Sequence, residues 1–140
     1  MCTKLRSSEI ILDTNFLMLP YQTGKNIFAM LEEMVLFKPN YVTIKSVIKE
    51  LESLCNNGSV KEQRAANLAL LIIKEIPVKV LDDPAVKGNT DDKILKVALM
   101  RRAIVATNDR ELRKKLRKKG VTVIFFREKD QRLWLEGEIY

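Results

Sequence analysis

Residues 10–18 read Ile-Ile-Leu-Asp-Thr-Asn-Phe-Leu-Met and place an acidic residue at the end of a short apolar run. Residues 9–12 have the length and composition of a buried β-strand, which Asp13 follows directly. A second apolar run, residues 103–106, leads into Asp109. Because open α/β sheets bind ligands at the carboxyl ends of their strands, both aspartates are candidate site residues.

Short apolar runs alternate with helical patterns along the rest of the chain. Strands are predicted at residues 9–12, 41–42, 78–81, 103–106 and 121–126, and helices at 27–38, 44–55, 59–75, 91–102 and 109–119. Strands separated by helices imply a parallel sheet covered on both faces. We therefore expect an α/β fold with three α/β/α layers around a parallel sheet of about five short strands.

The length of the chain predicts one domain over residues 1–140, with a core at about 9–126. Residues 127–140 are less regular, and we expect them to form an extension that packs on the body or on a partner. Thr43 is the expected cap of the helix that follows it. Ser59 and Glu62 predict a capping box for the next helix.

The absence of histidine from all 140 residues restricts the chemistry of any active site. It removes Ser-His-Asp and Cys-His catalysis and the usual zinc-hydrolase ligands. A catalytic site must then use carboxylates, Lys, Tyr, Ser/Thr or a metal ion. A ligand set made only of oxygen atoms suits Mg²⁺ or Mn²⁺.

The net charge of +7, from 25 Lys and Arg against 18 Asp and Glu, favours a polyanionic partner, most often nucleic acid. The alternative is a basic surface that only confers solubility. No apolar run is long enough to span a membrane, and the first ten residues lack a signal-peptide core. Cys2 and Cys55 form no disulfide or metal-binding pattern, so we expect a cytoplasmic protein.

Glu50 and the pair Asp91–Asp92 lie in helical patterns and complete the set of candidate acids. Each acid also has a structural explanation. Asp13 and Asp109 are good helix caps, and acids in a first helical turn are favoured by the helix dipole. Several carboxylates gathered at one rim would repel one another unless a divalent cation or protonation neutralised them.

At the first two acids the sequence resembles the PIN domain family. The string LDTNFLM resembles the first motif of the family, which implies Asp13 as a ligand and Asn15 as a polar supporting residue. The string TIKSVIKELE resembles the second motif, whose Glu-Leu pair selects Glu50 over Glu52. The resemblance covers roughly residues 9–126.

The last two acids continue the resemblance in the same order. The string TDDKILKVA resembles the third motif and aligns Asp91 with the family acid, with Asp92 kept as an alternative metal ligand. The string VATNDREL resembles the fourth motif and implies Asp109 as a ligand, supported by Thr107 and Asn108. Order, spacing and context agree, whereas each motif alone would be weak.

The resemblance implies a divalent-metal-dependent endoribonuclease that holds one or two Mg²⁺ or Mn²⁺ ions. The expected catalytic ligands are Asp13, Glu50, Asp91 and Asp109, with attack by activated water leaving 5′-phosphate and 3′-hydroxyl ends. The strings LDTNFLMLPYQ and ATNDRELRKKLRKKG look most like archaeal PIN proteins, which are similar to the eukaryotic small-subunit rRNA-processing endonuclease. The expected role is therefore rRNA processing or other RNA maturation.

Two alternative functions stay open. VapC-type toxins share the same four acids, and a catalytically weak RNA-binding or ribosome-assembly module would keep the fold. The expected partners are RNA, together with ribosomal precursors or an antitoxin protein. The resemblance also implies a homodimer.

A basic segment follows Asp109, where seven of the ten residues from 110 to 119 are Lys or Arg. Leu112 and Leu116 are expected to anchor one face of this helix. The residues expected to bind RNA are Arg110, Arg113, Lys114, Arg117 and Lys118, and Lys25, Lys45 and Lys49 extend the basic patch. Tyr21 is expected to stack on a base, or alternatively to pack in a lid or at a dimer contact. The alternative for the helix is a solvated surface.

Overall fold

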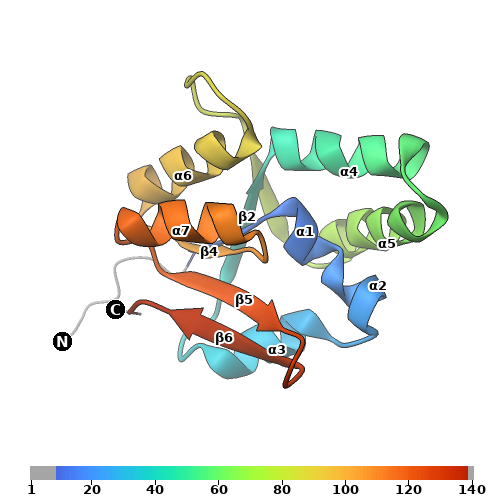
Figure 1. Cartoon of the computed structure of the whole chain (residues 1–140), viewed down its shortest axis with the longest axis horizontal. Coiled ribbons are helices and arrows are strands. Elements are labelled where there is room, and N and C mark those ends of the chain that lie inside the picture. The colour runs from blue at the N-terminus through green and yellow to red at the C-terminus, as the bar shows by residue number, and fades with distance from the viewer. Residues whose placement is uncertain (1–8, 139–140) are drawn as a thin grey trace.

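A six-stranded sheet with the strand order β3-β2-β1-β4-β5-β6 runs through the molecule (Figure 1). The computed structural model describes residues 9–138. Its strands are β1 (Glu9–Leu12), β2 (Asn40–Ile44), β3 (Val78–Leu81), β4 (Ile104–Ala106), β5 (Val123–Arg127) and β6 (Arg132–Glu136). All neighbouring pairs from β3 to β5 are parallel, and β6 pairs antiparallel with β5. The prediction of a central parallel sheet in an α/β fold is confirmed.

The predicted number of about five strands was too small, because residues 132–136 add β6 to the sheet edge. Leu133 is buried and Leu135 half-buried, whereas Arg132, Trp134 and Glu136 are exposed. This alternation is typical of a strand with one covered face. The turn before β6 contains no glycine or proline and instead places Gln131 in the left-handed region, with φ 56°, so the usual hairpin signal is missing.

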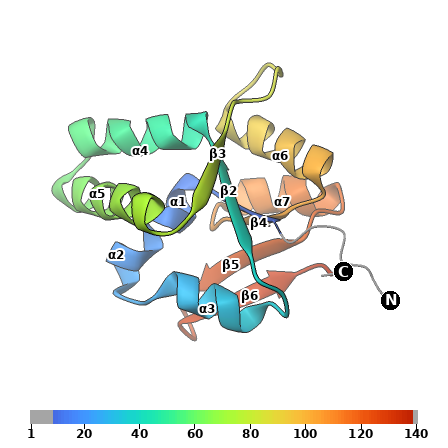
Figure 2. The ribbon, with the colours of Figure 1, turned by 180° about the vertical axis from the view of Figure 1, so that it is seen from behind.

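Seven helices connect the strands. They are α1 (Thr14–Leu17), α2 (Leu19–Thr23), α3 (Ile27–Met34), α4 (Lys45–Asn57), α5 (Val60–Glu75), α6 (Thr90–Arg101) and α7 (Arg110–Lys118). Figures 1 and 2 show α6 beside α7 and α4 beside α5. In Figure 1, α6 and α7 lie above the strands β5 and β6, whereas α3 lies below them. Helices therefore cover both faces.

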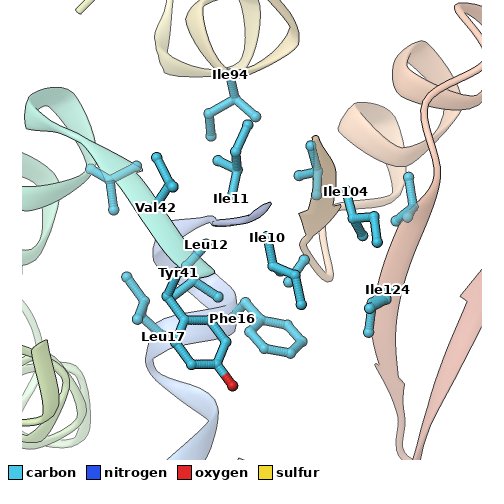
Figure 3. Packing of buried hydrophobic residues seen from close by; sticks show 14 of the residues in the cluster. Ile10, Ile11, Leu12, Phe16, Leu17, Tyr41, Val42, Ile94, Ile104 and Ile124 are labelled. Atoms are coloured by element: carbon cyan, nitrogen blue, oxygen red, sulfur yellow. The ribbon is translucent and has the colours of Figure 1, made fainter. Parts of the chain in front are cut away.

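The strand β1 lies at the centre of the hydrophobic core. Ile10, Ile11 and Leu12 are fully buried because the strand is paired on both edges and covered on both faces. Figure 3 shows Ile11 pointing toward Ile94 of α6, whereas Ile10 points to the opposite face of the sheet. This burial fixes the end of β1, and with it the backbone of Asp13.

Two local predictions were incomplete or wrong. The helices α1 and α2 were not predicted, because one-turn helices are too short to show an apolar period. Thr43 does not cap α4, since it lies in β2 and its hydroxyl donates to the carbonyl oxygen of Leu12 at 2.8 Å. The capping box of Ser59 and Glu62 at the start of α5 is confirmed.

Between residues 9 and 138 no helix combines the length and the apolar character needed to cross a membrane. Cys55 is partly buried against the core. Cys2 lies outside the described residues. The same holds for residues 1–8 as a whole, on which the prediction of no signal-peptide core mainly falls.

Candidate active site

The strands β1 and β4 are adjacent and parallel at the point where the strand order changes direction. From β1 the chain continues to β2 on one side, and α6 later brings it to β4 on the other side. The backbone N–H of Asp13 donates to the carbonyl oxygen of Ala106 at 3.1 Å, so both strands end together. Such a switch point is the usual ligand-binding crevice of an open α/β sheet.

Asp13 is held at this point by three donors. Its Oδ1 accepts the N–H of Thr14 at 2.8 Å, which caps α1, and its Oδ2 accepts the hydroxyl of Thr107 at 2.6 Å. The side-chain amide of Asn15 donates to the same Oδ2 at 3.2 Å. Only 4% of Asp13 is exposed, so the orientation of its carboxylate is strongly constrained.

The residues after β4 connect Asp13 to Asp109. The hydroxyl of Thr107 donates to Asp13 and also accepts the N–H of Asp109 at 3.1 Å. Asn15 reinforces the link, because its carbonyl oxygen accepts the N–H of Asn108 at 2.9 Å. Asp109 then caps α7 through Oδ1, which accepts two amides of the first helical turn.

Asn108 fixes this loop to the neighbouring strand. Its side-chain amide donates to the carbonyl oxygen of Phe126 at 3.1 Å and accepts the N–H of the same residue at 2.8 Å. The side chain therefore pairs with β5 as a strand backbone would. The structure thus places the three predicted supporting residues, Asn15, Thr107 and Asn108, in one network with Asp13 and Asp109.

Glu50 joins the cluster from α4 through two threonine hydroxyls. Thr14 donates to Oε1 at 2.5 Å, and Thr90 donates to Oε2 at 2.6 Å. Neither threonine was predicted to be a site residue, although Thr14 directly follows Asp13 and Thr90 directly precedes Asp91. Glu52 is two residues further along α4, about 200° around the helix, so it lies on a different face of α4 from Glu50; both residues are exposed.

Asp91 and Asp92 have different surroundings at the start of α6. Asp92 forms a reciprocal capping box with Asn89, in which each side chain accepts the backbone N–H of the other residue at 3.1 Å. The carboxylate of Asp92 also lies 4.0 Å from the ammonium group of Lys115. Asp92 thus helps to cap the start of α6, whereas the carboxylate of Asp91 is repelled by those of Asp109 and Glu50.

The pKa values of two acids are raised. Burial raises the pKa of Asp13 to about 6, against the hydrogen bond from Thr107 and with added repulsion from Asp91 and Glu50. Burial also raises the pKa of Asp91, and repulsion from Asp109 and Glu50 acts in the same direction. The four acids therefore lie close enough to disfavour one another's charge.

This donor set fits a divalent cation. It consists only of oxygen atoms, which Mg²⁺ and Mn²⁺ prefer, and the repulsion among the acids is relieved by positive charge. Within residues 9–138 no three of these side chains already surround a common point as metal ligands. The fit rests on the chemistry and the mutual repulsion of Asp13, Glu50, Asp91 and Asp109.

The basic residues of α7 divide into two groups. The guanidinium group of Arg113 lies 3.8 Å above the ring of Phe125, and Arg117 donates to the carbonyl oxygen of Val121 at 3.0 Å. These contacts give both arginines a structural role, which the sequence pattern did not indicate. Arg113 is half-buried, whereas Arg110, Lys114, Arg117 and Lys118 are exposed. Leu112 and Leu116 are buried as predicted.

Tyr21 and Lys115 differ in how they were predicted. Tyr21 lies on α2 and is 39% exposed, which leaves its ring accessible. Lys115 was counted in the basic segment but was not assigned to the site. Its ammonium group opposes the rise in the pKa of Asp91 that burial and Asp109 cause, so it belongs to the surroundings of the acids.

We expect Asp91→Asn and Glu50→Gln to weaken Mn²⁺ binding measured by calorimetry, since each removes a negative ligand. Asp92→Asn should have a smaller effect, because the carboxylate of Asp92 serves the capping box and an asparagine amide oxygen can still accept the N–H of Asn89. Glu52→Gln is the matched control for Glu50→Gln and should leave binding unchanged. The opposite order within either pair would show that the ligand assignment is shifted along the helix.

Comparisons with known proteins identify the family of the chain. Residues 10–129 match a family described as PIN like domain. The chain is 35% identical over 124 residues to ribonuclease VapC4 of Methanocaldococcus jannaschii, covering 86% of this chain and 92% of that protein. It is 29% identical over 126 residues to ribonuclease VapC9 of Archaeoglobus fulgidus, covering 90% and 87%.

Solved structures show the same fold. The structure of the PIN domain endonuclease Utp24 matches with a TM-score of 0.75 and 24% identity, covering 94% of this chain and 92% of that chain. The structure of VapBC2 from Rickettsia felis, bound to a DNA fragment from its promoter, contains a chain that matches with a TM-score of 0.62 and 17% identity. The match covers 85% of this chain and 99% of that chain. On the family match and the identity to VapC4, this chain belongs to the PIN-like domain family.

Proposed function

We propose that this protein is a divalent-metal-dependent endoribonuclease. The observation that carries the proposal is the convergence of Asp13, Glu50, Asp91 and Asp109 at the switch point of a PIN-like domain whose sequence has no histidine. The two curated relatives, both named ribonucleases, support RNA as the substrate. The net charge of +7 agrees with a polyanionic substrate.

The four acids would hold one or two Mg²⁺ or Mn²⁺ ions, which activate water and neutralise charge on a phosphodiester. The chain supplies the positioning. Thr107 and Asn15 fix Asp13, and the threonine hydroxyls on Glu50 hold α1, α4 and α6 together. Asp13, whose pKa is raised to about 6, still binds part of a proton near neutral pH and would release it as positive charge approaches. The pKa of Asp91 is raised in the same direction by burial and by repulsion from Asp109.

The test is cleavage of an end-labelled single-stranded RNA by the purified chain. Cleavage should require Mn²⁺ or Mg²⁺, stop on addition of EDTA, and leave 5′-phosphate and 3′-hydroxyl ends, because water is the nucleophile. A product with a 2′,3′-cyclic phosphate, or full activity in EDTA, would contradict the proposal.

The RNA backbone is proposed to follow the exposed cations of α7, which begins at Asp109. Arg110, Lys114 and Lys118 can contact phosphates beside the acids, and Tyr21 of α2, which is partly exposed, offers a stacking surface. Arg113 and Arg117 stabilise the contact between α7 and the β5–β6 end of the sheet instead.

Reversing the charges of Arg110, Lys114 and Lys118 to Glu should weaken RNA binding for all sequences alike. The slope of log K against log[salt] should fall by roughly 0.7 for each phosphate that the variant no longer binds. Folding stability should change little, since the three side chains are exposed. The matched control reverses Lys61, Arg64 and Lys74 of α5, and equal effects of both triple variants would place the RNA elsewhere.

A toxin of a toxin–antitoxin pair is the cellular role that the sequence comparisons favour. The two curated relatives are VapC ribonucleases and align over most of this chain, whereas the likeness to Utp24 concerns the fold. A toxin should co-purify with a small antitoxin encoded beside it. Maturation of ribosomal RNA in the cytoplasm is the second proposal, and a chain that co-purifies with ribosomal precursors and no small protein would support it. The homodimer remains a prediction.

A further inference from the structure

Asp83 lies at the centre of a polar contact between α4 and α6. It follows β3, and its Oδ1 accepts the backbone N–H of Ser46 at 2.9 Å, while its Oδ2 accepts the hydroxyl of Ser46. The ammonium group of Lys93 lies 3.1 Å from the same Oδ2 and 3.3 Å from the Ser46 hydroxyl. The side chains of Lys93 and Asp83 are each 24% exposed, so the pair is largely shielded from solvent.

This contact replaces a cap that α4 does not have in its own sequence. The residue at its cap position is Ile44, which offers no side-chain acceptor. The first amides of a helix need acceptors, and Asp83 supplies one from a distant part of the chain. Its hydrogen bonds with Ser46 and Lys93 lower its pKa despite partial burial. Asp83 is therefore charged at neutral pH, as an acceptor at a helix start favours.

The two helix starts that Asp83 connects are the ones that present two of the four acids. Glu50 lies four residues after Ser46 on α4, about one helical turn away. Asp91 lies two residues before Lys93, in the first turn of α6. Figures 1 and 2 show the starts of α4 and α6 side by side in both views. A shift of either start would move one acid relative to the other.

We propose that Asp83 is a positioning residue for the active site, which sets the distance between Glu50 and Asp91 by binding the starts of α4 and α6. This inference rests on the proposed function of the four acids. Asp83 acts through Ser46 and Lys93 and does not itself touch the substrate. Residues that orient metal ligands in this indirect way typically change metal affinity or activity by about 10–100-fold when replaced.

The neighbouring Asp82 provides a matched control. It lies in the same loop and carries the same charge, but its side chain is 85% exposed and pairs at 2.7 Å with the exposed Lys45. Replacing Asp82 by Ala removes one negative charge near the site without touching the contact between the helices. A difference between the two alanine variants therefore reports the contact and not the charge.

The experiment compares Asp83→Ala with Asp82→Ala and Ser59→Ala in the full chain. Asp83→Ala should weaken Mn²⁺ binding in calorimetry and lower kcat for RNA cleavage by roughly 10-fold, with KM for RNA unchanged. Asp82→Ala should leave all three quantities unchanged. Ser59→Ala removes the cap of α5, so it should lower Tm without altering Mn²⁺ affinity or kcat, which separates positioning from stability.

Conservative replacement gives the last readout. Asp83→Asn keeps an acceptor for the Ser46 amide, so it should recover most of the Mn²⁺ affinity that Asp83→Ala loses. If Asp83→Ala binds Mn²⁺ and cleaves RNA as Asp82→Ala does, the positioning role is overturned while the proposed function stands. If the wild-type chain neither binds Mn²⁺ nor cleaves RNA, the proposed function fails, and the positioning role fails with it.

Discussion

Asp13→Asn should reduce RNA cleavage by roughly 10²–10³-fold at pH 7–8, the loss typical of removing one preorganised group that stabilises transition-state charge. Asp13 is the most buried of the four acids and is fixed by Thr14, Thr107 and Asn15. Removing its charge takes a negative ligand from the centre of the site. The measurement is the initial rate of cleavage at saturating Mn²⁺.

The fold should survive this substitution. Asparagine remains a good cap for α1, and its amide oxygen can still accept the N–H of Thr14. Circular dichroism should therefore be unchanged, and Glu52→Gln, the same kind of replacement outside the cluster, should keep the wild-type rate. If Asp13→Asn cleaves RNA at the wild-type rate, Asp13 is not catalytic.

Asp13 and Asp109 could be predicted from local signals, whereas Glu50 and Asp91 were selected by the resemblance to the PIN domain family. Asp13 follows a buried strand, Asp109 precedes a helix with a clear apolar face, and both are helix caps in the structure. Strand ends and helix starts are determined by short stretches of sequence. The parallel order of the strands then brings these ends to one rim, where Asp91 and Glu50 also contribute.

The contacts that hold the acids were harder to predict because they join distant parts of the chain. The hydroxyl of Thr90 reaches Glu50 across 40 positions, and Asp83 caps α4 from 37 positions away. No local pattern distinguishes such a threonine or aspartate from a solvated residue. Arg113 shows the opposite case, because a strong local signal for a basic surface gave no indication that its guanidinium group packs on Phe125.

The stability of the metal-free protein should depend on pH through Asp13. Its pKa rises from 3.8 to about 6 on folding, so the folded chain binds a proton that the unfolded chain releases between these values. The wild-type chain therefore gains stability from this group below about pH 4 and loses it as the pH rises through 6. The raised pKa of Asp91 acts in the same direction.

Asp13→Asn isolates this effect from the other titrating groups. In EDTA, wild type and variant should differ least near pH 4, and the variant should become more stable by about 2–3 kcal/mol above pH 7, because each pKa unit corresponds to about 1.4 kcal/mol. Urea unfolding at several pH values measures the difference. Saturating Mn²⁺ should make wild type the more stable of the two at pH 7–8. Ligand binding stabilises a fold by mass action, and the variant binds the ion more weakly. If the variant is less stable than wild type in EDTA at pH 8, the charged Asp13 carboxylate stabilises the metal-free fold. The explanation of the site by burial and mutual repulsion of the acids would then be wrong.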